Sequence, residues 1–259
     1  VWSQPIDVST PWQTTGGVRA YWTAEGSQKT QSTPSLQNLS LRLHKLAALI
    51  PVTDELRDDA PAIDNYLMSR VPIAFDYEIN NAIIAGTGVG QPLGILNSGA
   101  LVTVAAEAGQ AVDTIHANNI NKMWGRLYAG FRNDAVWLVN QDVEGKLPYL
   151  AAAATMPDGT TVVGPTATYW GPGDLRNNNN FGLLLNRPVI ATEACSALGD
   201  VGDIILASFS QYLTVTKVAG LRSDISIHLW FDYDVTAFRF VFRLAGGPWL
   251  QTPIARKGS

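Results

Sequence analysis

The chain is poor in the residue types from which most active sites, metal centres and covalent frameworks are built. Its 259 residues include one cysteine and three histidines. The lone Cys195 excludes an intrachain disulfide and fits a reducing compartment. His44, His116 and His228 lie far apart, and no pair has the spacing of metal ligands. The sequence therefore predicts no metal site and no cofactor.

Charge is scarce, and so are long apolar runs. Charged residues make up 15% of the chain, well below the roughly 25% usual in globular domains. The net charge of −4, with Lys and Arg scattered, argues against nucleic-acid binding through a basic face. No apolar stretch approaches the roughly 18 residues that a membrane span needs, and nothing at the N-terminus resembles a secretory signal. Because the chain opens at Val1 without Met, an upstream segment is expected to be cleaved, disordered or outside this sequence.

Two patterns that could carry chemistry have simpler interpretations, and a third is absent. The glycines of residues 86–90 resemble a phosphate loop, but they follow a predicted helix and no Gly-Lys-Ser/Thr occurs, which favours a chain reversal. No Gly-x-Ser-x-Gly elbow is present, although a triad formed in space cannot be seen in a sequence. The carboxylates of Asp54, Glu55, Asp58 and Asp59 could bind a cation, but they are also typical of the approach to a helix N-terminus. We predict no catalytic residue.

The abundant residue types point to contact with other chains. Hydrophobic residues make up 46% of the sequence, which also contains eight tryptophans. A neutral, moderately apolar domain would explain these values. Extensive surface buried against neighbours would explain them as well, because charge is depleted and aromatics are enriched there. A chain of this length can bury a real core, as one domain or as two interleaved lobes.

The N-terminal part predicts a hairpin without a core of its own. Residues 1–35 are rich in Thr, Ser, Gln, Gly and Pro. We expect a strand over residues 18–23, a polar tip over 26–34 and a return strand over 36–43, where leucines alternate with polar residues. Since isolated two-stranded ribbons are marginal in water, this hairpin should pack on another chain.

A long amphipathic helix is predicted next. Asp58 or Asp59 can cap it, with Pro61 in its first turn, and its apolar face continues to Gly86. Pro72 interrupts the pattern, because proline removes one backbone hydrogen bond and clashes with the preceding turn, at a cost of about 3 kcal/mol. We therefore expect a kinked or broken helix.

The rest of the chain predicts short elements and one pair of long strands. The expected elements are an amphipathic helix over 113–129, a buried strand over 135–140, a helix over 143–153 interrupted at Pro148, a loop-rich stretch over 155–182, and brief strands over 183–185, 188–191 and 204–207. Two long antiparallel strands, over 225–231 and 238–244, should be joined through residues 232–234. This mixture is α+β, without the βαβ alternation of a doubly wound fold.

Several segments occur in a specific order along nearly the whole chain: 20–26, 39–48, 49–56, 58–60, 86–96, 186–189, 202–206 and 209–210. In this order they resemble the Hong Kong-97-type (HK97-fold) major capsid proteins of tailed bacteriophages. The resemblance assigns 20–26 and 39–48 to the two arms of the E-loop, 49–56 and 58–60 to the entry to the spine helix, 86–96 to its exit, and the remaining segments to later signatures. No single segment is decisive, but their order and spacing together are specific.

The resemblance implies an HK97-like fold with four parts. Residues 1–44 would form the N-terminal segment and E-loop hairpin, 45–92 the peripheral (P) domain with the spine helix, 93–214 the inserted axial (A) domain, and 215–259 the return strands of the P domain. Subunits would form hexamers and pentamers of an icosahedral head around double-stranded DNA, which is held without sequence-specific contact. The chain would be no enzyme and would lie in the virion capsid after assembly in the host cytoplasm.

The resemblance also suggests assembly partners and residues. The partners would be copies of the chain itself, with a decoration protein, the portal, and scaffolding or a protease as further candidates, and no membrane. Trp2, Trp12 and Trp22 are expected interface anchors, because aromatics supply much of the energy of interfaces, although they could pack within their own subunit. Glu25 and Lys29 lie in the E-loop segment.

Some family members lock the shell with an isopeptide bond between an E-loop Lys and an Asn of a neighbour, assisted by a Glu. Lys29 lies at the matching place, but no Asn follows Asn186 and no Glu follows Glu193, whereas the family's pair lies in the C-terminal strands. Without an amide to attack and a carboxylate to take the proton, the bond has no route. We therefore expect no crosslinks.

Two other functions stay open. An encapsulin, a cellular nanocompartment, would share the fold but enclose protein cargo in place of DNA. An α+β hydrolase would need clustered acid–base residues, and none is visible in the sequence.

Overall fold

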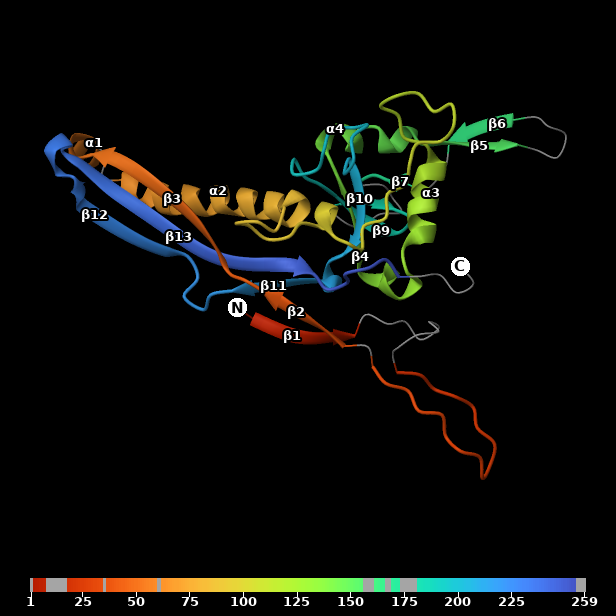
Figure 1. Cartoon of the computed structure of the whole chain (residues 1–259). Helices are drawn as coiled ribbons and strands as arrows, with labels where there is room; N and C mark the ends of the chain where they lie inside the picture. The colour runs from red at the N-terminus through yellow and green to blue at the C-terminus, as the bar shows by residue number, and fades with distance from the viewer. Residues whose placement is uncertain are drawn as a thin grey trace. The chain divides into compact units, whose positions relative to one another are not determined.

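The computed structural model describes residues 2–7, 18–34, 36–59, 62–155, 161–165, 169–172 and 181–254. The chain divides into two compact units. Unit 1 comprises Val1–Ala100 and Leu213–Ser259, and unit 2 comprises Leu101–Tyr212 (Figure 1). No helix in the described part of the chain is long and apolar enough to cross a membrane.

Unit 1 is built on a four-stranded antiparallel sheet whose central strand is β13 (Val235–Pro248). Its neighbours are β3 (His44–Thr53), β11 (Tyr212–Thr216) and β12 (Arg222–Trp230). The predicted pair of long antiparallel strands is confirmed, since Ile225 of β12 pairs with Phe238 of β13. They are joined through η5 (Phe231–Tyr233) and Asp234, which has a left-handed φ of 51°. The third long strand, β3, was not predicted.

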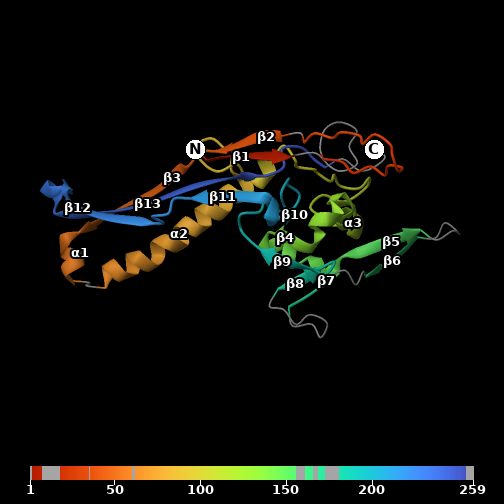
Figure 2. The same cartoon turned by 90° about the horizontal axis from the view of Figure 1, so that it is seen from below.

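Two helices follow β3, and the longer one covers one face of the sheet. α1 (Asp54–Asp59) is short, and α2 (Ile63–Ala85) runs alongside β13 (Figures 1 and 2). Alternate residues of β3 and β13 face α2 and form one core, with these members fully buried: Val52, Leu67, Val71, Phe75, Phe238 and Phe240. The other face of the sheet is left without a covering layer from the helices.

The start of α2 differs from the prediction. Asp58 and Asp59 do not cap it, because they lie in the last turn of α1, and the N-cap position of α2 is Ala62, which makes no side-chain capping bond. Pro61 lies outside the described residues. Asp54 instead joins α1 to the sheet, since its carboxylate Oδ1 accepts a hydrogen bond of 2.6 Å from the buried Thr236 hydroxyl.

Pro72 lies inside α2, which continues through it as a single helix of 23 residues. The prediction of a broken helix is therefore wrong, and a bend at Pro72 stays a prediction. The helix tolerates the missing backbone donor because buried side chains on both sides of the proline, Val71 and Phe75, anchor it to the sheet.

The N-terminal hairpin pairs differently from the prediction. The return strand β2 (Leu36–Leu41) pairs antiparallel with β1 (Trp2–Asp7), in a register that places Trp2 opposite Leu41. Residues 18–23 form no strand. Residues 18–34, which we call the extended loop, project as an open ribbon whose two arms are linked where Ser32 Oγ bonds both the N–H and the carbonyl of Arg19.

The glycines after α2 form a chain reversal, as predicted. Thr87 bridges Leu93, and Gly88 and Gly90 take positive φ angles. The side-chain amide of Asn97 closes the helix end by donating to the carbonyls of Ala85 and Gly86, at 2.9 and 3.0 Å. A short η1 (Ile95–Asn97) follows this reversal.

Unit 2 is a five-stranded mixed sheet with one main helix. The strand order is β10 (Ile204–Ser208), β4 (Ala135–Val139), β9 (Arg187–Ala191), β8 (Gly182–Leu184) and β7 (Tyr169–Trp170), in which only β4 and β9 pair in parallel. The main helix is α3 (Ala117–Arg126), and the short 3-10 helices of the unit include η2 (Ala129–Asp134) and η4 (Phe209–Gln211). The predicted helix and buried strands are thus confirmed, with a shorter helix.

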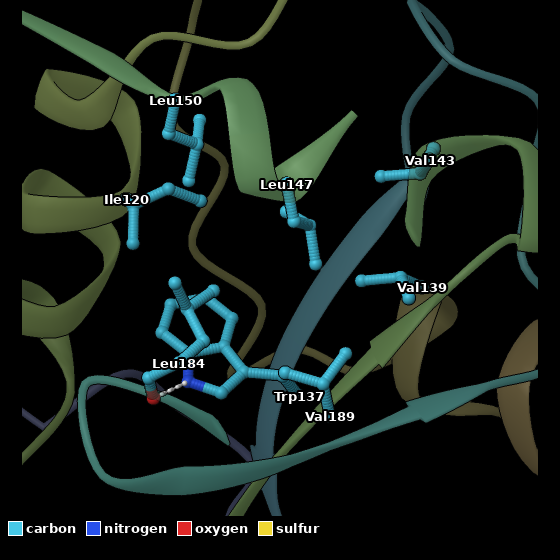
Figure 3. Close-up of a cluster of buried hydrophobic side chains, with 8 residues drawn as sticks. All are labelled: Ile120, Trp137, Val139, Val143, Leu147, Leu150, Leu184 and Val189. Atoms are coloured by element: carbon cyan, nitrogen blue, oxygen red, sulfur yellow. Dashed lines mark hydrogen bonds between the residues drawn. The ribbon is translucent and has the colours of Figure 1, made fainter. Parts of the chain in front are cut away.

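A single hydrophobic cluster holds unit 2 together (Figure 3). Trp137 is completely buried, and its indole N–H donates to the Leu184 carbonyl at 3.0 Å, so the ring adds no unsatisfied donor to the core. The other members are Ile120, Val139, Val143, Leu147, Leu150, Leu184 and Val189.

The helix predicted over 143–153 is wrong. The segment forms α4 (Gln141–Glu144), η3 (Leu147–Tyr149) and β5 (Ala151–Thr155), and β5 pairs with β6 (Thr161–Pro165). Pro148 falls inside η3, where its fixed φ suits a tight turn better than a helix interior. Val143, Leu147 and Leu150 of this segment are buried in the cluster from successive turns.

We predict that Gly94→Ala destabilises unit 1 by about 2–3 kcal/mol. An added Cβ would lie 2.6 Å from the Ile84 carbonyl oxygen and closer still to the Gly86 nitrogen, both backbone atoms that cannot move aside. Urea unfolding of the unassembled subunit measures the loss. Gly125→Ala is the matched control, because its Cβ would meet no atom within 4 Å; equal midpoints for the two variants would contradict the packing described here.

Candidate assembly surface

The side chains that could carry catalysis are dispersed. Among the described residues, no group of three or more His, Cys, Asp and Glu side chains could hold a metal ion. His44 lies on β3, His228 on β12, and His116 precedes α3, where its backbone N–H donates to the Asn119 side-chain oxygen at 3.0 Å. Burial, with a smaller contribution from Asp203, raises the pKa of the Cys195 thiol to about 11. A thiol that stays protonated at neutral pH is a poor nucleophile.

The carboxylates at the start of α1 have a structural role. Asp54 and Glu55 occupy the first turn of this helix, as the helix-start interpretation predicts. Asp54 also receives the Thr236 hydroxyl, and its backbone N–H donates to the Asp234 carbonyl at 3.0 Å. These contacts tie the loop between β12 and β13 to the end of β3.

The extended loop presents the predicted assembly residues to solvent. Trp22 is fully exposed, and Glu25 and Lys29 are exposed near the loop tip. Trp2, on β1, is about one-third exposed at 36%, and Trp12 lies outside the described residues. The structure therefore does not bring these residues together into one site, and Trp22 packs on no part of its own described chain.

A second apolar surface of unit 1 was not predicted. Ile225, Ile227 and Leu229 of β12 are each more than half exposed, and so are Phe231 and Tyr233 in the turn that follows. The sequence predicted a long strand here from the alternation of residues 225–231, but it did not predict that the apolar row is exposed. The structure shows that α2 covers β3 and β13 but leaves this edge strand open.

The uncovered face of the sheet is basic. Its exposed cations are Lys45 on β3, Arg222 on β12, and Arg239 and Arg243 on β13. We call these four side chains the basic sheet face. In β3, the even-numbered residues from Leu46 to Val52 face α2. The odd-numbered Lys45 therefore lies on the opposite face of the sheet, as do the three arginines on the neighbouring strands.

The two ends of the basic sheet face differ in how their charges are compensated. Arg239 donates to Asp224 at 2.7 Å, and this hydrogen bond lowers the pKa of the Asp224 carboxyl, which also lies 4.0 Å from Arg222. Lys45 and Arg243 are instead directly opposite each other in the register. Neither has an ion-pair partner among the residues whose placement is described. Like charges directly opposite each other destabilise a sheet.

The helices of unit 1 have the opposite charge. Residues 54–85 hold seven carboxylates against two arginines. Asp64 pairs with Arg57 at 3.7 Å, whereas Asp58, Asp59, Asp76 and Glu78 are exposed and make no ion pair within the described ranges. We call α1 and α2 the acidic helical layer. Exposed apolar rows and segregated charge are features through which proteins bind one another.

Comparisons with known proteins identify the fold. The capsid of a native GTA particle has 18% identity and a TM-score of 0.67, with 98% of this chain and 85% of that chain covered. A structure from Microbacterium phage Oxtober96 has 17% identity, a TM-score of 0.61, and coverage of 96% and 80%. One from Mycobacterium phage Adephagia has 16% identity, a TM-score of 0.59, and coverage of 97% and 80%. Comparison with curated proteins gave no match.

The family follows from a match along the sequence itself. The model of the "Phage capsid family" matches residues 5–256, which is nearly the whole chain and includes both units. This confirms the resemblance and the α+β capsid fold predicted from the order of the sequence segments. The chain therefore belongs to the phage capsid family.

Proposed function

We propose that this capsid protein is the major shell subunit, which assembles into hexamers and pentamers of an icosahedral phage head around double-stranded DNA. The family match over residues 5–256 carries the proposal. The solvent-exposed extended loop supports it, because a ribbon with no core of its own gains stability only by packing on another chain. The head is the virion capsid, assembled in the host cytoplasm.

The two compact units correspond to the two domains of such a subunit. Unit 1, made from both ends of the chain, is the peripheral domain with the spine helix α2, and unit 2, inserted between them, is the axial domain. The extended loop is the E-loop. Pro72 provides a place where α2 bends during expansion of the shell. A decoration protein, the portal, and scaffolding or a protease are the further partners of this assembly.

The subunit performs no chemical transformation. Phage capsid family members and the matched capsids are structural proteins. In the described part of this chain the support is the dispersal of its histidines, the buried Cys195 thiol and the structural role of Asp54.

We expect the purified protein to form closed shells of megadalton mass that contain nucleic acid when isolated from virions. Size-exclusion chromatography and electron microscopy test the assembly, and nuclease-resistant DNA in the particles tests the contents. Shells filled with protein cargo would instead indicate an encapsulin-type compartment. A catalytically active small oligomer would end the proposal.

We predict that the shell is not covalently crosslinked. Lys29 is exposed in the extended loop, but the sequence beyond Glu193 contains neither Asn nor Glu, so β12 and β13 offer no amide to attack and no glutamate to take the proton. Boiled particles should give one monomer band on a denaturing gel. A ladder of multimers that disappears in Lys29→Arg would refute this.

We predict that Trp22→Ala lowers assembly at least tenfold while leaving the unassembled subunit as stable as before. The side chain is fully exposed in the subunit, so its truncation removes no intrachain packing, whereas truncation of an aromatic anchor at an interface typically costs 2 kcal/mol or more. Shell yield at fixed protein concentration measures the effect, and Trp22→Phe, which keeps an aromatic ring, is the control. Unchanged yield for Trp22→Ala would show that this tryptophan is no anchor.

A further inference from the structure

We infer that the free edge of β12 pairs antiparallel with β12 of a second copy, around a two-fold axis at Ser226, and that this contact joins neighbouring capsomers. The inference rests on the proposed self-assembly and names one surface through which it occurs. Three observations carry it: an unprotected sheet edge, an exposed apolar row along that edge, and a strand sequence that matches itself when two copies are opposed.

β12 forms an open edge of the sheet in unit 1 (Figure 1). In the described part of the chain it pairs with β13 alone, so the backbone groups on its other side meet no strand. Its register with β13 stops at Ser226 and resumes at Trp230, which leaves residues 227–229 without a register partner in their own sheet. Free N–H and C=O groups along an edge strand are a template for pairing with another chain.

The two edges of this sheet differ in how they are protected. β3 forms the other edge and contains Lys45 and Pro51, residue types that block pairing between edges. β12 has nine residues without lysine or proline. Its arginine and its aspartate, Arg222 and Asp224, lie 4.0 Å apart and compensate each other. The charges of β12 therefore protect its edge less than those of β3 do.

An exposed apolar row follows the free edge of β12. Ile225 and Ile227 are each exposed at 52%, and Leu229 is exposed at 54%. Ile225 lies opposite Phe238 in the register, so it faces the side of the sheet on which α2 packs. The helix covers β3 and β13 but not this row. A further strand beyond β12 would bring side chains beside the row and remove it from water.

The apolar residues of β12 match each other when two copies are opposed at Ser226. In this register, which we call the Ser226 register, Ile225 lies opposite the second copy's Ile227. The match continues beyond the ends of the strand, where Phe231, exposed at 74%, would lie beside the second copy's Leu221, exposed at 38%. Each of these apolar pairs occurs twice, because the axis repeats it.

The polar residues of β12 are matched in the same register. Asp224 lies opposite the second copy's His228, whose imidazole N–H can donate to a carboxylate. Arg222 lies opposite the second copy's Trp230, and a guanidinium group is attracted to the face of an indole ring. No like charges are opposed, which would destabilise the pairing. One register therefore suits both faces of the strand.

The geometry of this contact suits a shell one subunit thick. A two-fold axis perpendicular to the sheet places the two copies side by side and keeps both α2 helices on the same side. The contact is isologous, so it closes with two copies and cannot grow into a row. Neighbouring hexamers and pentamers of an icosahedral shell meet across such axes. The contact therefore belongs between capsomers, in agreement with the proposed peripheral position of unit 1.

The extended loop of another copy is the competing strand for this edge, because its arms are also open ribbons. β12 is favoured because a single register matches its apolar row and its polar row together. The two partners can be separated by experiment, since only a pairing of β12 with itself brings a residue directly against its own copy.

A single cysteine tests the two-fold axis. Opposed Cα atoms of an antiparallel pair lie about 4.5–5.5 Å apart, within the range of about 4.4–6.8 Å that a disulfide spans. Shells of Ser226→Cys, oxidised with copper phenanthroline, should run mainly as a disulfide-linked dimer on a non-reducing denaturing gel. Cys195 is buried and should not react. Ile225→Cys with Ile227→Cys, which bridges the same axis, replaces this variant if it fails to assemble.

Ser223→Cys is the matched control on the same strand. In the Ser226 register the two copies of Ser223 would lie roughly 20 Å apart along the strands, too far for a disulfide. Its shells should give at least fivefold less dimer than those of Ser226→Cys.

A charge in the apolar row tests whether the contact joins capsomers. Ile227→Lys should leave hexamers and pentamers intact but lower the yield of closed shells at least tenfold, because a lysine blocks edge pairing. The urea midpoint of the unassembled subunit should change little, since the side chain is half exposed. Val89→Lys adds the same charge at a valine that is 85% exposed in the reversal after α2, and should keep shell yield within twofold.

The outcomes separate this inference from the proposed function. If the unchanged protein forms no shells under any condition, the proposed function fails and the inference fails with it. If shells form but oxidised Ser226→Cys shells stay monomeric, or if Ser223→Cys gives as much dimer, only the inference is overturned. Loss of shells in Ile227→Lys together with monomeric Ser226→Cys would assign the edge to a different strand, such as the extended loop, and overturn it as well.

Discussion

The packing of α2 against the phenylalanine row of β13 is the contact on which the rest of unit 1 depends. Phe238 and Phe240 are almost completely buried beneath Leu67, Val71 and Phe75, and burial of each such side chain stabilises the fold by about 1.5–3 kcal/mol. A single helix can cover only part of a four-stranded sheet. The edge strand β12 and the basic sheet face therefore stay exposed. Because this core uses only part of one face of the sheet, the rest of the sheet stays exposed. The subunit is therefore incomplete by itself.

The sequence predicted the elements whose side chains alternate or recur locally. The β12–β13 pair, α3 and β4 are examples, because periodicity depends only on neighbours along the chain. Pairing partners depend on distant residues and were missed. β2 has the expected strand pattern, but it pairs with β1 across the extended loop and not with residues 18–23. The segment around Pro148 was assigned to a helix because its apolar spacing fits one, whereas the buried residues reach the core from consecutive short turns.

The candidate surface was predictable to a smaller extent. Exposure of Trp22 and Lys29 agrees with their assignment to the loop by family resemblance. The basic sheet face could not be found in this way, because Lys45 and Arg243 are almost two hundred residues apart and become neighbours only through the β3–β13 register. Scattered cations in a sequence of low charge suggested no basic patch. Strand pairing brings these cations together on one face of the sheet. Composition cannot show this pairing, and the scattered cations therefore led to the expectation that no basic face exists.

Segregated charge also decides which contacts between copies are disfavoured. Residues 1–100 and 213–259, the span of unit 1, contain twelve carboxylates and twelve Lys or Arg side chains, so this unit is neutral in total while its helices are acidic and its sheet face is basic. A symmetric pair that joins two helical layers, or two sheet faces, brings like charges together and is penalised. Low total charge and strong local charge thus act together: the first limits the desolvation cost of many interfaces, and the second disfavours the two orientations that bring like charges together.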